Sequence, residues 1–140
     1  MSDRSQSSVS RVDYYDRLGQ ARPLRVDERA LVTKMVKDTP YQDEITGLLG
    51  DILVRDMPDG GMGSIKFQTT TRKPRYGRQI AEGAFRDRDG MPVSVTLSLD
   101  KKGQLFELDV FRADGSPLIS YPELDDFEIV KRHGKLGWAG

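Results

Sequence analysis

The clearest fold signal in the chain is VSVTLSLDKKGQLFELDV, residues 93–110. From position 93 to 99, apolar residues alternate with Ser or Thr, which is the pattern of a strand with one buried face. A two-residue turn at Lys102-Gly103 predicts an antiparallel hairpin. Its apolar pairs are then Leu99–Phe106, Leu97–Leu108 and Val95–Val110, and its polar pairs are Ser98–Glu107 and Thr96–Asp109. A slip by one residue would bury the carboxylates, so this register is strongly specified.

Turn residues also separate the other predicted strands from position 51 onward. Gly, Pro and Asp mark these turns because they favour the backbone conformations that turns require. Short connections between successive strands favour hairpins, and therefore an antiparallel meander. The predicted strands are 51–57, 63–70, 78–86, 92–99 and 104–111.

Two short helices are predicted before the strands. In residues 27–37 the apolar side chains fall at helical spacing, at Leu31, Val32, Met35 and Val36. A second helix follows the capping sequence at Thr39-Pro40 and ends near Gly50. The predicted fold class is therefore α+β, with two short N-terminal helices packed on one face of a roughly five-stranded antiparallel meander sheet. Residues 122–130 fit either a short helix or a last strand.

The length of 140 residues fits one domain, and the chain contains no cysteine. We expect residues 1–22 to form an N-terminal tail, residues 23–130 the domain, and residues 131–140 a C-terminal tail. The first ten residues do not resemble a secretory signal, and no stretch reaches the roughly 20 apolar residues of a membrane span. The sequence therefore predicts a cytoplasmic protein.

Charge is unevenly distributed along this neutral chain, because residues 79–130 carry 5 basic and 11 acidic side chains. The predicted sheet places part of this acidity on its polar face. The candidate partner-binding residues are Glu82, Thr96, Glu107 and Asp109. An alternative is hydrolysis or carbohydrate chemistry by Glu82 and Asp109, since two strand spacings of about 4.8 Å would separate them by roughly 10 Å.

A second candidate site is basic. Its residues, Arg72, Lys73, Arg75, Tyr76 and Arg78, could contact phosphates and stack a base. The neutrality of the whole chain argues against nucleic-acid binding. The sequence Asp87-Arg88-Asp89-Gly90 resembles the start of a calcium loop, but it lacks the later ligands and predicts a turn. His133 is the sole histidine, so we expect no metal site and no cofactor.

The chain resembles a family of small bacterial proteins catalogued as a domain of unknown function. The motifs that carry the resemblance are Arg-Pro-Leu before an acidic helix start, Asp-Gly-Gly-Met-Gly-Ser, Phe-Arg-Asp-x-Asp-Gly, Leu-Phe-Glu-Leu-Asp-Val and Ser-Pro-Leu. They lie at residues 22–31, 56–64, 85–90, 105–110 and 116–118, so the resemblance spans about residues 22–121.

Some relatives of that family resemble immunity proteins of bacterial toxin systems. This resemblance implies a non-catalytic domain whose partner is a protein, for example a basic toxin domain. The acidic face, which lacks a recognisable set of catalytic residues, favours the same interpretation. The sequence leaves the oligomeric state open.

Overall fold

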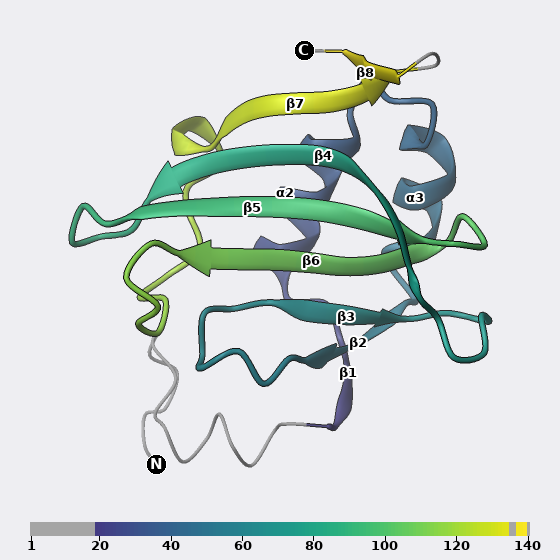
Figure 1. Cartoon of the computed structure of the whole chain (residues 1–140), viewed down its shortest axis with the longest axis horizontal. Helices are drawn as coiled ribbons and strands as arrows, with labels where there is room; N and C mark the ends of the chain where they lie inside the picture. The colour runs from purple at the N-terminus through teal and green to yellow at the C-terminus, as the bar shows by residue number, and fades with distance from the viewer. Residues whose placement is uncertain (1–18, 135–136, 140) are drawn as a thin grey trace.

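The computed structural model describes residues 19–134 and 137–139, and Figure 1 shows how their helices and strands are arranged. The elements are β1 (Ala21–Pro23), α2 (Val26–Val36), α3 (Gln42–Leu48), β2 (Leu53–Asp56), β3 (Ile65–Gln68), β4 (Tyr76–Arg86), β5 (Pro92–Asp100), β6 (Leu105–Arg112), the 3-10 helix η1 (Leu124–Asp126), β7 (Glu128–Gly134) and β8 (Gly137–Ala139). Residues 1–18 of the predicted N-terminal tail and the side chain of His133 lie outside the described part.

The described strands form one antiparallel sheet with the order β1-β2-β3-β6-β5-β4-β7-β8. Three consecutive strands, β4 to β6, form a meander, and β3 pairs with β6 rather than with β4. This is the arrangement of a Greek key. The connection of residues 69–75 carries the chain from β3 past the ends of β6 and β5 to β4 (Figure 1).

The hairpin of β5 and β6 has the predicted register over most of its length. Val95 pairs with Val110 and Leu97 with Leu108, but Leu99 pairs with Leu105 because a bulge intervenes after Ser98. The carboxylate of Asp100 accepts N–H groups from Lys102 and Gln104, so the turn is wider than two residues. The predicted pairing of Leu99 with Phe106 is therefore wrong.

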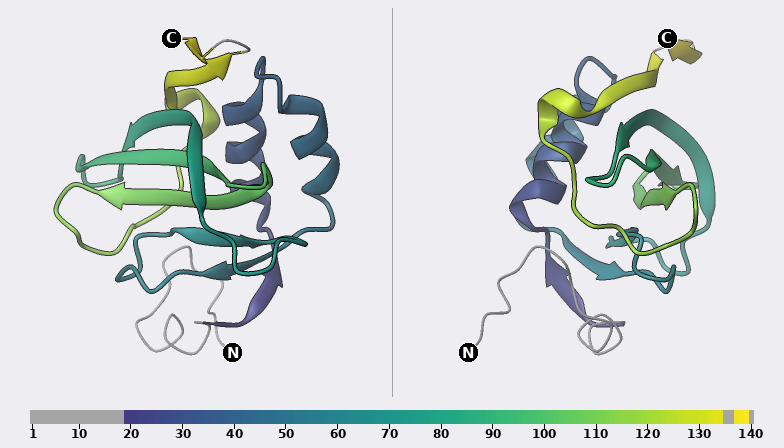
Figure 2. Two further views of the ribbon diagram at one scale, coloured as in Figure 1. Left: turned by 45° about the vertical axis from the view of Figure 1, so that its right-hand side comes forward. Right: turned by 90° about the vertical axis from the view of Figure 1, so that its left-hand side faces the viewer.

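Both helices lie on one side of the sheet, with α3 beside α2 (Figure 2). The N–H of Arg25 is capped by the carboxylate of Glu28 at 2.7 Å, which fixes the start of α2. The predicted apolar face of α2 is buried and packs in one core with side chains from α3 and the strands. The alternating apolar residues of β5 and β6 face this core.

The five-stranded meander with N-terminal helices is a wrong prediction, although the α+β class is confirmed. Eight described strands form the sheet, and a strand precedes both helices. β1 escapes the pattern analysis because it has three residues and includes Pro23. Residues 122–130 contain both alternatives that the sequence leaves open, since η1 is followed by β7. β7 and β8 extend the sheet into the range expected to be a C-terminal tail.

Gly83 allows β4, β7 and Phe127 to pack closely. A Cβ atom on Gly83 would lie 2.1 Å from Cζ of Phe127 and 2.8 Å from the carbonyl oxygen of Glu128. Phe127 is buried, and its ring contacts that of Phe85 with centroids 6.3 Å apart. Only glycine fits at this position without a shift in the core.

Candidate functional site

Three of the four candidate partner-binding residues lie in one row across neighbouring strands. Glu82 on β4 is paired with Thr96 on β5, which is paired with Asp109 on β6. Glu107 precedes Asp109 by two positions and is paired with Ser98. Because side chains alternate along a strand, all four candidates lie on the face opposite the apolar core. Glu82, Thr96, Glu107 and Asp109 are hereafter the sheet-face site.

Two lysines flank the sheet-face site at opposite sides. Lys66 on β3 is the register partner of Glu107, and Lys131 on β7 is the register partner of Glu82. The ammonium of Lys66 also lies 5.2 Å from the ring centroid of Phe106. Neither lysine was predicted on this face, because a meander places β3 beside β4 and because Lys131 falls in the predicted C-terminal tail. The face therefore carries three carboxylates between two ammonium groups.

Two exposed aromatic side chains lie near the ends of this face. Tyr76 is 52% exposed at one end, where its ring meets Phe106 edge-on with centroids 6.4 Å apart. Phe111 is 50% exposed at the other end and is paired with Ser94 on β5. Exposed aromatic rings beside polar groups are enriched where proteins bind one another.

The two acidic residues on β6 are in different environments. Burial raises the pKa of Glu107, nearby Lys66 opposes that rise, and Asp109 adds to it. Asp109 is exposed, and its Oδ1 lies 3.2 Å from Oγ of Ser64, which holds its side chain toward β3. A cation that approaches Glu107 would favour its charged form and so oppose the rise in its pKa.

The residues of the basic candidate site do not form one surface. Arg78 turns toward the helices, where its guanidinium donates to the hydroxyl of Tyr41 and lies over that ring at 5.7 Å. Tyr76 turns instead toward Phe106. The other three basic residues, Arg72, Lys73 and Arg75, are exposed on the connection between β3 and β4.

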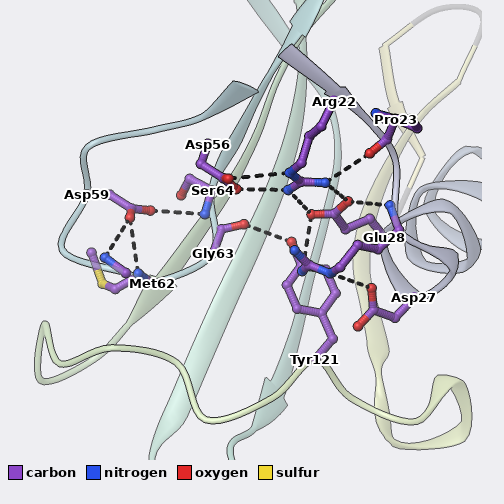
Figure 3. Close-up of polar contacts among 12 residues, drawn as sticks. Arg22, Pro23, Asp27, Glu28, Asp56, Asp59, Met62, Gly63, Ser64 and Tyr121 are labelled. Carbon is purple, nitrogen blue, oxygen red and sulfur yellow. Dashed lines mark hydrogen bonds and ion pairs between the residues drawn. The ribbon is translucent and has the colours of Figure 1, made fainter. Parts of the chain in front are cut away.

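A buried ionic network lies at the start of α2 (Figure 3). The guanidinium of Arg22 donates to both carboxylate oxygens of Glu28 at 2.9 and 2.8 Å, and to Asp56 at 3.3 and 2.8 Å. Glu28 is fully buried and also pairs with Arg25 at 3.1 Å. Burial opposes the charged form of Arg22, but hydrogen bonds to Glu28 and Asp56 raise its pKa above the ordinary value. The network joins β1, α2 and β2.

The loop of residues 57–64 is organised around the carboxylate of Asp59 (Figure 3). It accepts N–H groups from Gly61, Met62 and Ser64 at 3.0–3.1 Å. The loop connects two strands, and its amides are directed at a side chain of the same loop. It is therefore a hairpin connection and not a phosphate-binding loop.

A second ionic cluster surrounds Arg112 at the end of β6. Its guanidinium contacts Asp87, Asp89 and Asp114 at distances of 2.6–3.1 Å. Hydrogen bonds from Arg112 lower the pKa of Asp114 to about 2 and also lower the pKa of Asp89. The turn predicted at residues 87–90 is present. That its aspartates hold an arginine from another strand could not be predicted from the local sequence.

Both networks also hold the segment of residues 117–121. Asp87 accepts N–H groups from Ile119 at 2.8 Å and Ser120 at 3.2 Å. The hydroxyl of Tyr121 donates to the carbonyl of Gly63 at 2.8 Å, and the Arg25 guanidinium lies 5.3 Å from the Tyr121 ring centroid. Four of the stretches that carry the family resemblance, 22–31, 56–64, 85–90 and 116–118, therefore supply residues of the two networks or of the segment that contacts them.

The described residues contain no group of three or more His, Cys, Asp and Glu side chains arranged to hold a metal ion. In the same part of the chain, no helix has the length and apolar character needed to cross a membrane.

Comparison with known proteins identifies a family but no characterised relative. A family described as Domain of unknown function (DUF6984) matches residues 21–122. No curated protein and no solved structure matches the chain. The match begins at β1 and ends after the segment held by Asp87 and Gly63, so it covers both ionic networks. The chain therefore belongs to the DUF6984 family.

Proposed function

We propose that this chain is a non-catalytic protein-binding domain that uses the sheet-face site. The observation that carries the proposal is the row of Glu82, Thr96 and Asp109 on three adjacent strands, with lysines at its sides and exposed aromatic rings at its ends. Side chains on a paired sheet lose less freedom on binding than the same groups on a loop. Such a surface favours a partner with cationic groups at its centre and carboxylates at its margins.

The same geometry gives little support to catalysis by the two outer carboxylates. Glu82 and Asp109 are separated by a whole strand, so their spacing is roughly 10 Å, near the upper limit for an inverting glycosidase. Asp109 is exposed, whereas Glu107, whose pKa burial raises, is not one of this pair. A carboxyl group that acts as a general acid needs a pKa raised by burial, and the pair would also need a site that excludes water.

The more specific form of the proposal is an immunity protein that neutralises a basic toxin domain in the bacterial cytoplasm. It rests on the resemblance of some related proteins to toxin-immunity proteins and on the carboxylates at the centre of the face. Charge complementarity of this kind accelerates association and fixes the orientation of docking.

The experiment is co-expression with the protein encoded by the neighbouring gene. If that protein arrests growth, the chain should restore it, and the triple variant Glu82→Gln/Glu107→Gln/Asp109→Asn should restore it poorly. Purified proteins should show an association rate that falls several-fold in the triple variant at low salt, with a weaker dependence on salt.

The matched control neutralises Arg72, Lys73 and Arg75, which are exposed on a different part of the surface. A loss of association in this control, with the triple variant unaffected, would assign recognition to the basic residues and favour an acidic protein or a nucleic acid. A neighbouring protein that is not toxic, or is not neutralised, would refute the immunity role. Normal binding by both variants would refute the sheet-face site.

A further inference from the structure

A shallow groove of about 460 Å³ lies between the first turn of α2 and the segment that leads into η1. Its walls are Arg25, Val26, Asp27 and Ala30 on the helix side and Pro122, Glu123 and Leu124 on the other. Val26 is 87% exposed and Leu124 is 40% exposed, so apolar side chains are left facing solvent on both walls. The groove is separate from the sheet-face site, which lies on the opposite face of the sheet from the helices.

Both walls of the groove are held by contacts from outside it, including the ammonium of Lys34 on α2, which donates to the carbonyls of Leu124 and Phe127. On the helix side, Glu28 is held by Arg22 and caps the N–H of Arg25. On the other side, Asp87 holds the backbone just before Tyr121. Buried ion pairs are weak evidence for stability, because desolvation offsets much of their attraction. Here the ion pairs, together with Lys34, hold in place two walls that are far apart in sequence.

The chemistry of the walls selects for an apolar side chain beside a cation. Four of the seven lining residues, Val26, Ala30, Pro122 and Leu124, are apolar. Of the charged residues there, Arg25 is already paired with Asp27 and Glu28 and lies against a tyrosine ring. Asp27 is half exposed and Glu123 is exposed, and the acidic residues of η1 follow immediately.

We propose that this groove binds a short peptide segment in which an apolar side chain is flanked by Lys or Arg. The apolar side chain would lie between Val26 and Leu124, and the cation would face Glu123. This binding surface is independent of the sheet-face site, so either proposal can fail without the other.

The test is selection from a display library of short random peptides on the folded wild-type protein, with counter-selection on Val26→Ser/Glu123→Lys. We expect enriched peptides that combine an apolar residue with Lys or Arg. The single variants Val26→Ser and Glu123→Lys should each weaken binding of a selected peptide about tenfold, since one removes an apolar anchor and the other reverses the charge.

Matched controls come from α3. Leu48 is 44% exposed and Glu44 is exposed, and neither lines the groove, so Leu48→Ser and Glu44→Lys should leave the affinity unchanged. The sheet-face variant Glu107→Gln should also bind the selected peptide normally. The proposal is overturned if no peptide prefers the wild type over the double variant, if the enriched peptides lack a cation, or if the α3 variants lose as much affinity as the groove variants.

Discussion

The guanidinium of Arg112 has five N–H donors, and its five contacts with Asp87, Asp89 and Asp114 use all of them. Arg112 is only 5% exposed. A cluster of three aspartates in this setting could otherwise attract a metal ion, and here an internal cation takes that position. Asp87 also accepts two backbone N–H groups, so the side chain that pairs with Arg112 also positions residues 119 and 120.

This cluster predicts a loss of stability in acid. Hydrogen bonds from Arg112 lower the pKa of Asp114 to about 2 and lower that of Asp89. Burial opposes ionisation of Asp87, but bonds from Ile119, Arg88 and Arg112 lower its pKa overall. A carboxylate with a depressed pKa stabilises the fold above its unfolded pKa of about 3.9, and this contribution is lost as the pH falls toward the folded value.

We therefore expect the urea midpoint of the wild type to fall between about pH 4 and pH 2. Asp114→Asn should lower the midpoint at pH 7 and flatten this decline. Glu107→Gln is the control, because its raised pKa has the opposite sign and cannot produce acid destabilisation. An unchanged slope in Asp114→Asn would show that other groups cause the acid sensitivity.

The close packing around Gly83 predicts a second effect on stability. Gly83→Ala should cost about 1–3 kcal/mol, because the added methyl group overlaps Phe127 and the backbone of Glu128. In the background of Phe127→Leu the same change should cost less, since the ring is gone while the backbone contact remains. Chemical unfolding of the four proteins of this double-mutant cycle measures the coupling. Purely additive costs would contradict the assigned contact.

At the level of elements, predictability followed the strength of the local pattern. Strands β5 and β6 and the apolar face of α2 alternate clearly enough to assign their faces and most of their register. The bulge after Ser98 was not visible because it depends on the side chain of Asp100 capping a wider turn. β1 and β7 lack an alternating pattern, and their place in the sheet is set by long-range pairing.

The core face of the β5–β6 hairpin makes the third prediction. Leu97→Ala and Leu108→Ala should each lower the free energy of unfolding by about 2–5 kcal/mol, because both side chains are fully buried and leave a cavity. Phe111→Ala on the exposed face is the control and should change stability by about 0.5 kcal/mol or less. Equal urea midpoints for the core variants and the control would refute the assigned faces.

For the whole molecule, the sequence located the acidic residues of the sheet-face site but not their surroundings. Alternation along β4, β5 and β6 was sufficient to place Glu82, Thr96 and Asp109 on one face. Lys66 could not be placed there without knowing that β3 pairs with β6. The groove could not be anticipated either, because its walls come from residues 25–30 and 122–124, which are far apart in sequence and meet only in the folded chain.

The junction between β3 and β6 has consequences for the order of folding. Its register contains two pairs, Ile65–Leu108 and Lys66–Glu107, and forming it closes a loop that contains all of β4 and β5. The β4–β5–β6 meander consists of local hairpins and can form before that loop closes. We expect β2 and β3 to open as a unit before the meander does, and hydrogen exchange to be faster in β2 and β3.

Uniform exchange rates across the sheet would contradict this order. Opening of the junction would also separate Lys66 from Glu107, so the sheet-face site has its flanking lysine from β3 only in the closed molecule. A partner that needs both charges therefore binds the closed form alone and suppresses the opening. Its signature would be slower exchange at amides of β2, a strand that holds no residue of the sheet-face site.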